Sequence, residues 1–193
     1  METDVLGWPY ERHSIDLGTD DEGPVVATLV RRRADTPTRR AVLYVHGFVD
    51  YFFQTHLADF FVERGWDFYA LDLRKYGRSL LPHQTPNFAR SLTDYFPELD
   101  EAARIIRAQD GHDQLLVAGH STGGLITSLW AHTRQGRGIV DGLFRKRPST
   151  MPRSWRECDH SDVIRPPVEW PATSSWSWPS SSRMIRAASS SSG

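Results

Sequence analysis

Residues 115–130 read LLVAGHSTGGLITSLW, and this stretch decides the fold. A short apolar run leads into Gly119-His120-Ser121-Thr122-Gly123, and apolar residues at helical spacing follow it. This order predicts a strand that turns sharply into a helix and presents Ser121 at the apex. Glycine is expected at positions 119 and 123 because a Cβ at either place would collide with neighbouring backbone.

The helix predicted after Ser121 points its N-terminal amides toward the serine, where they favour negative charge. Serine between glycines also occurs in ordinary loops. The strand-like run before the pattern and the helix-like run after it favour the chemical interpretation.

Composition indicates one globular domain, since 193 residues suffice to bury a core. A formal net charge of -1 gives no reason to expect nucleic acid or an anionic membrane as a partner. The single cysteine, Cys158, excludes an intramolecular disulfide and favours a reducing compartment. The N-terminus lacks the features of a secretory signal, and no apolar run approaches the roughly 20 residues of a membrane span. We therefore expect a cytoplasmic protein of undetermined oligomeric state.

Strand-like and helix-like segments alternate along the chain up to residue 144. Two β-rich segments, 13–17 and 25–30, predict an antiparallel hairpin around a turn over 18–24. The further strands are expected at 41–45, 66–73, 114–118 and 139–144, and the helices at 54–64, 91–109 and 122–134. Gly65 is expected to end the first helix, and Pro97 to split off the first turn of the second. The alternation predicts an α/β fold with a mainly parallel sheet and helices on both faces.

A basic cluster lies around a proline turn between the hairpin and the third strand and consists of Arg31, Arg32, Arg33, Arg39 and Arg40. It fits either an anion site or a solvated loop. We favour a solvated loop because no aromatic residues are interleaved with the arginines.

Three motifs follow one another on successive strands: His46-Gly47-Phe48, then DLRKYGRS at 72–79, then GHSTGG at 119–124. In this order they resemble the α/β-hydrolase superfamily, in particular its serine aminopeptidase, monoacylglycerol lipase and lysophospholipase-like branch. The resemblance covers approximately residues 10–144.

The resemblance implies a serine hydrolase that cleaves carboxylic esters or related small acyl substrates through an acyl-enzyme on Ser121, without a cofactor or a metal. The backbone amides of Phe48 and Thr122 match the two donors of an oxyanion hole. Gly119 and Gly123 match the glycines of the turn. A cofactor-free perhydrolase is a related alternative that fits the same GHSTGG sequence.

Other polar residues near these motifs are expected to have structural roles. In this superfamily the triad runs Ser, acid, His along the chain, so His46 and Asp72 come too early to belong to it. We expect His46 to support the oxyanion loop and Asp72 to fix the turn after its strand. The side chain of His120 is expected to diverge from Ser121. The aromatic residues 51–53 fit either an acyl pocket or core packing.

The composition changes abruptly after Phe144. Residues 145–193 contain no Leu, Phe or Tyr and are rich in Ser, Pro, Arg and Trp. Such a segment buries too little apolar surface to offset its ordering entropy, so we expect it to be largely disordered. Residues 1–144 would then form a partial α/β-hydrolase core whose C-terminal strands and cap are missing.

One hypothesis for this change is a shifted reading frame, and the alternative is a genuine low-complexity tail. Sequencing the DNA and RNA around the Phe144 codon decides between them, because an intact frame there would refute the shift.

The tail also decides the chemistry, because a serine nucleophile needs a base and an acid that orients the base. Only His132 and His160 follow Ser121 in the chain. His132 would lie about 16 Å along the helix from the serine, out of hydrogen-bond reach. His160 stands beside Asp159 in the tail. Two interpretations therefore remain, an acyl-transferring serine hydrolase and a truncated, non-catalytic relative.

Overall fold

The computed structural model describes residues 1–134, 137–146 and 163–164. Its strands are β1 (Glu2–Thr3), β2 (Glu11–Asp20), β3 (Gly23–Arg32), β4 (Arg40–Val45), β5 (Asp67–Asp72), β6 (Gln114–His120), β7 (Gly142–Lys146) and β8 (Val163–Ile164). Its helices are α1 (Thr55–Val62), α2 (Phe96–Arg104) and α3 (Thr122–Thr133). Shorter helical turns are η1 (Gly77–Ser79), η2 (Leu92–Tyr95) and the π-helical η3 (Ile105–Gln109).

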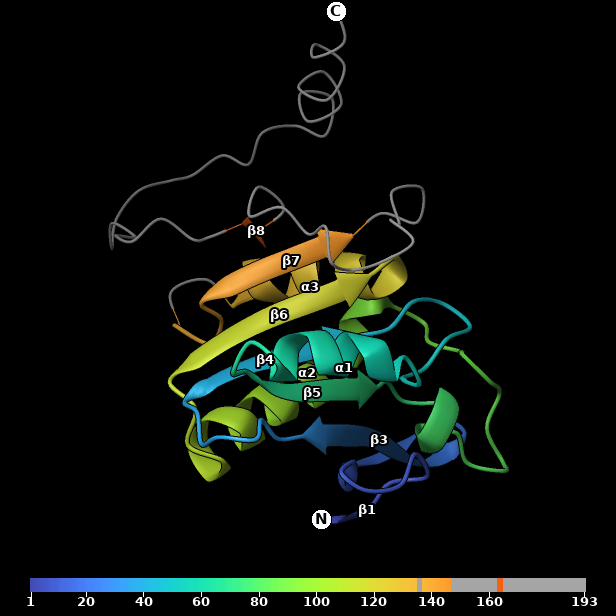
Figure 1. Cartoon of the computed structure of the whole chain (residues 1–193). Helices are drawn as coiled ribbons and strands as arrows, with labels where there is room; N and C mark the ends of the chain where they lie inside the picture. The colour runs from blue at the N-terminus through green and yellow to red at the C-terminus, as the bar shows by residue number, and fades with distance from the viewer. Residues whose placement is uncertain (135–136, 147–162, 165–193) are drawn as a thin grey trace, which may run out of the picture.

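The described strands form one sheet in the order β1-β2-β3-β5-β4-β6-β7-β8. The central strands β5, β4, β6 and β7 are parallel, whereas β1, β2 and β3 add an antiparallel edge and β8 pairs antiparallel with β7. Figure 1 shows α1 on one face of the sheet and α2 and α3 on the other. The predicted α/β fold with a mainly parallel sheet is confirmed.

The strands β4, β5 and β6 divide their side chains between two cores, because successive residues of a strand point to opposite faces. In β4, Ala41, Leu43 and Val45 belong to one core, and Val42 and Tyr44 belong to the other. All five are buried, as the unbroken apolar run predicted for a strand covered on both faces. The second core is completed by α1.

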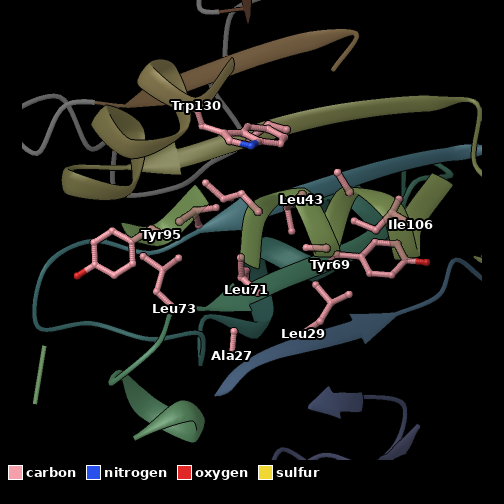
Figure 2. Close-up of a cluster of buried hydrophobic side chains, with 14 of the residues drawn as sticks. Ala27, Leu29, Leu43, Tyr69, Leu71, Leu73, Tyr95, Ile106 and Trp130 are labelled. Atoms are coloured by element: carbon pink, nitrogen blue, oxygen red, sulfur yellow. The ribbon is translucent and has the colours of Figure 1, made fainter. Parts of the chain in front are cut away.

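The larger core lies under α2 and α3 (Figure 2). It contains Leu99 of α2, Ile106 of η3 and Trp130 of α3, none of which is exposed. The indole Nε1 of Trp130 donates to Asp100 Oδ1 at 2.8 Å, so a hydrogen bond as well as apolar packing joins α3 to α2. The helix that begins at Ser121 is thereby held on the sheet.

Two local helix signals are confirmed. Gly65 has a φ of 71°, and its amide donates to the Val62 carbonyl at 2.9 Å, which ends α1. The predicted 91–109 helix is divided near Pro97: Ser91 caps the turn η2, and α2 begins at Phe96.

The hairpin and the strand expected at 139–144 have other bounds than predicted. The hairpin turn is shorter than 18–24, because β2 continues to Asp20 and β3 begins at Gly23. Gly18 instead adopts a φ of 77° at an irregularity where the β2–β3 register shifts. The strand expected at 139–144 runs from Gly142 to Lys146, because only these residues pair with β6.

The expected solvated loop at the basic cluster is wrong for Arg31. Its side chain is 9% exposed and bonds Glu11 at 2.5 Å and Asp110 at 3.0 Å. The other four arginines also have partners within the chain, namely Asp59 for Arg32, Asp110 for Arg33, Asp113 for Arg39 and the carbonyls of Arg64 and Gly65 for Arg40. Because all five arginines already have partners within the chain, the structure does not support an anion site here.

The predicted disorder of the tail concerns residues that lie mostly outside the described part of the chain, so the division at residue 144 stays a prediction. Within the described ranges, no helix has both the length and the apolar character needed to cross a bilayer.

A pair of leucine truncations tests the core. Leu99→Ala, at a fully buried position of α2, should lower the free energy of unfolding by about 2–5 kcal/mol. Leu129→Ala, at a position of α3 that is 37% exposed, should lower it by less than about 1 kcal/mol. Urea unfolding followed by tryptophan fluorescence measures both values, and equal losses would contradict the described core.

Candidate active site

Ser121 lies between the last residue of β6 and the first residue of α3. Its backbone has a φ of 51° and a ψ of -117°, a conformation that side-chain-bearing residues rarely adopt. Its carbonyl accepts the amide of Leu125 at 3.2 Å and so starts the helix. The chain therefore changes from strand to helix within one strained residue, and such strain is concentrated at functional sites.

The glycines on either side of Ser121 lie where backbone segments touch. A Cβ on Gly119 would lie 2.5 Å from the Gly124 Cα. A Cβ on Gly123 would lie 2.9 Å from the Val45 carbonyl carbon and would overlap the carbonyl oxygens of Val45 and His46. The first turn of α3 therefore rests directly on the end of β4, and any side chain would push them apart.

The loop that follows β4 lies against this turn. A Cβ built on Gly47 would lie 3.4 Å from the Ser121 Cβ and 3.1 Å from His120 Nδ1. The segment that carries the Phe48 amide and the helix start that carries the Thr122 amide therefore meet beside Ser121. Phe48 is 62% exposed.

His46 is buried, and both of its ring nitrogens are engaged. Nε2 lies 3.0 Å from the Leu73 amide, which can only donate, so Nε2 accepts. Nδ1 then carries the proton and donates to the Gly47 carbonyl at 2.8 Å. Burial lowers the pKa of His46, which keeps the ring neutral. This geometry agrees with the predicted supporting role and leaves no ring nitrogen for a serine.

Asp72 ends β5 and is fully buried. One carboxylate oxygen accepts the Phe52 amide at 2.9 Å. The other accepts the Arg78 amide at 3.1 Å and Arg78 Nη1 at 2.8 Å. Asp72 therefore fixes the turn after β5, as predicted, and in addition holds the loop that follows Phe48.

The aromatic residues after that loop divide between core and surface. Phe52 is fully buried, with its ring centroid 5.2 Å from that of Phe68. Tyr51 is 42% exposed and Phe53 is 54% exposed, and their ring centroids lie 5.5 Å apart. Core packing is confirmed for Phe52, and the other two rings are exposed to solvent.

His120 packs against the loop, a contact that no local sequence pattern predicts. Its Nδ1 lies 3.8 Å from Asp50 Oδ2 and beside Gly47, as described above. The loop therefore contacts both residues at the end of β6 and the start of the turn.

Among the residues that the structure describes, no histidine from later in the chain lies against Ser121. His132 lies near the far end of α3, and His160 with Asp159 lies outside the described residues. In the described part of the chain, no group of three or more His, Cys, Asp or Glu side chains is arranged to hold a metal ion.

The sequence matches the profile of the family described as serine aminopeptidase, S33, over residues 36–145. The chain belongs to this family, which is part of the α/β-hydrolase superfamily. No curated protein sequence matches the chain significantly.

Solved structures share the fold. A thermostable carboxyl esterase from Bacillus coagulans, in complex with glycerol, is 18% identical with a TM-score of 0.59, covering 69% of this chain and 43% of the esterase. A monoglyceride lipase variant from Saccharomyces cerevisiae, in complex with a substrate analogue, is 20% identical with a TM-score of 0.56, covering 74% of this chain and 45% of the lipase. The match therefore spans less than half the length of these proteins.

Adding one methyl group at the turn tests the backbone contact. Gly123→Ala should lower the free energy of unfolding by about 3 kcal/mol or more, because the contacting atoms are backbone carbonyls that cannot rotate away. Ser128→Ala, on the same helix, adds no atoms and serves as the control. Thermal melting of both variants measures the difference, and an unchanged Gly123→Ala melting temperature would contradict the contact.

The two buried histidines predict opposite pH dependences. Because the folded pKa of His46 lies below the ordinary 6.5, its contribution to stability is present above pH 6.5 and is lost as pH falls through the folded pKa. For His112, burial lowers the pKa, but the hydrogen bonds to Asp67 and the Ile106 carbonyl, together with the nearby charges of Asp67 and Asp110, outweigh burial and raise the pKa. Its contribution is present below pH 6.5 and is lost as pH rises through its folded pKa.

Imidazole NMR titration measures both histidines in one sample. The His46 midpoint should lie below 6.5 and the His112 midpoint above it. The reverse order would contradict the hydrogen bonding described for both rings.

Proposed function

We propose that the chain derives from, and supplies the nucleophile half of, a serine hydrolase that cleaves carboxylic esters or related acyl groups. Ser121 is the nucleophile, and the amides of Phe48 and Thr122 form the oxyanion hole. The observation that carries the proposal is the close approach of the Gly47 loop to the strained Ser121, where a Cβ added to Gly47 would lie 3.4 Å from the Ser121 Cβ. Membership of a serine hydrolase family supports the same assignment.

The proposed reaction has two steps. Ser121 Oγ attacks the substrate carbonyl carbon while a base takes the serine proton. The bond to the leaving oxygen then breaks, the base returns the proton to that oxygen, and the alcohol departs from the acyl-enzyme. In the second step the base takes a proton from water, which attacks the acyl carbon; the bond to Oγ breaks, Oγ regains the proton, and the carboxylic acid and the free serine are released. In each step the carbonyl oxygen becomes negatively charged, and losing one amide donor to it would cost about 2.7–4 kcal/mol.

The loop beside Ser121 best fits a substrate with an apolar acyl group. The rings of Phe48, Tyr51 and Phe53 are all more than 40% exposed and belong to the loop that contacts Ser121. The structural relatives include an esterase bound to glycerol and a monoglyceride lipase bound to a substrate analogue. The proposed chemistry requires no cofactor and takes place in a compartment that we propose to be the cytoplasm.

A second candidate is a non-catalytic relative that at most binds acyl ligands. It is favoured by one observation: among the described residues, no histidine that follows Ser121 in the chain lies against it. His160 is the remaining candidate for the base. The chain covers 43% of the esterase, so the activity of a whole enzyme remains a proposal.

Labelling with a fluorophosphonate distinguishes the two candidates. The hydrolase proposal predicts stoichiometric labelling, read by intact mass, that Ser121→Ala abolishes. Ser128→Ala is the matched control, because Ser128 lies on α3 and its hydroxyl donates to the Gly124 carbonyl at 2.6 Å. A folded, monodisperse chain that does not label would contradict the hydrolase proposal and support the second candidate.

A further inference from the structure

The loop between His46 and Phe52 begins and ends at a buried residue. Each of these two residues is hydrogen-bonded to the segment 72–78. At its start, His46 accepts the Leu73 amide at 3.0 Å. At its end, the Phe52 amide donates to Asp72 at 2.9 Å, and the Phe52 carbonyl accepts Arg78 Nη1 at 2.8 Å. The residues between the anchors include Val49, whose φ of 53° is uncommon for a β-branched residue. The direction of the intervening amides therefore depends on the anchors.

The side chain of Arg78 holds the end of the loop at Phe52. Its Nε and Nη2 donate to the two carboxylate oxygens of Asp4 at 2.6 and 2.8 Å, and its Nη1 donates to Asp72 at 2.8 Å. The Arg78 side chain is 5% exposed, and the side chains of both acids are fully buried. The bidentate geometry toward Asp4 uses the planar fork of a guanidinium, which a lysine does not provide.

Asp4 brings the N-terminal segment into this arrangement. Its other hydrogen bonds are local: its carboxylate accepts the Leu6 amide at 3.1 Å, and its backbone amide donates to Tyr10 at 2.9 Å. Burial raises the pKa of Asp4, but the hydrogen bonds from Arg78 and from backbone amides, together with the nearby charge of Arg78, outweigh burial and hold the pKa below its usual value. Asp4 is therefore a fixed negative charge that keeps the guanidinium in place at neutral pH.

We propose that Arg78, held by Asp4 and Asp72, is a positioning residue for the oxyanion loop, and that it sets the direction of the Phe48 amide beside Ser121. The inference rests on the function proposed above. Arg78 touches no reacting atom in this scheme. Arg78 acts on the Phe48 amide through its hydrogen bond to the Phe52 carbonyl and through the backbone of residues 48–52.

Two conservative variants test the proposal in the full chain. Arg78→Lys keeps the charge and loses the bidentate geometry, and Asp4→Asn keeps the shape and loses the charge of the partner. Arg104→Lys, in an exposed ion pair with Glu101 on α2, is the matched control. Fluorophosphonate kinetics should show that the maximal inactivation rate falls about tenfold or more in the first two variants, with the half-saturating concentration unchanged. A purely structural defect would instead lower the fraction of active protein without changing the rate of that fraction.

Amide hydrogen exchange gives a second readout that needs no activity. The amide of Phe52 and its neighbours in the 48–53 loop should lose protection in Arg78→Lys and Asp4→Asn, while the amides of β6 keep theirs. If wild-type protein does not label, the proposed function fails, and exchange alone decides whether Arg78 positions the loop. Wild-type exchange in both variants, or a wild-type inactivation rate in Arg78→Lys, would overturn the proposal.

Discussion

The close approach of α3 to the end of β4 is the constraint on which the site depends. The first turn of the helix touches the carbonyls of Val45 and His46 at Gly123, and it touches the end of β6 at Gly119. No side chain fits between these backbone segments. The contact places Ser121 in a strained conformation and brings the start of α3 beside the loop that leaves β4. The residues that hold α3 down, Trp130 above all, therefore also determine the geometry of the turn.

The loop after β4 is held by a different kind of interaction. Buried polar groups fix it: the neutral ring of His46, the carboxylate of Asp72 and the guanidinium of Arg78. Such groups lose solvation on burial, and they are tolerated because their hydrogen-bonding atoms are paired. Among the described residues, no buried side-chain nitrogen or oxygen lacks a partner. Apolar packing thus fixes the helix, polar pairing fixes the loop, and the proposed oxyanion hole lies where they meet.

Local sequence predicted the elements well, because their signals are local. The strand–glycine–serine–helix pattern predicted the turn at Ser121, and the apolar run at 41–45 predicted a strand buried on both faces. Arg78 lies in the motif at 72–79, but it could not be paired with Asp4 from sequence, since 74 positions separate the two residues. The missing aromatic residues favour a solvated loop at Arg31, but its partner Asp110 lies 79 positions away and has no local signal. His160, the remaining candidate for the base, lies outside the described residues.

The most direct measurement of the central claim is a crystal structure of the full chain after treatment with a fluorophosphonate. The account predicts a phosphorus atom bonded to Ser121 Oγ, with one phosphoryl oxygen within about 3 Å of the amide nitrogens of both Phe48 and Thr122. An adduct on Ser121 whose oxygen contacts neither amide would contradict the account. An unmodified Ser121 in an otherwise ordered turn would show that this arrangement of backbone does not by itself activate the serine.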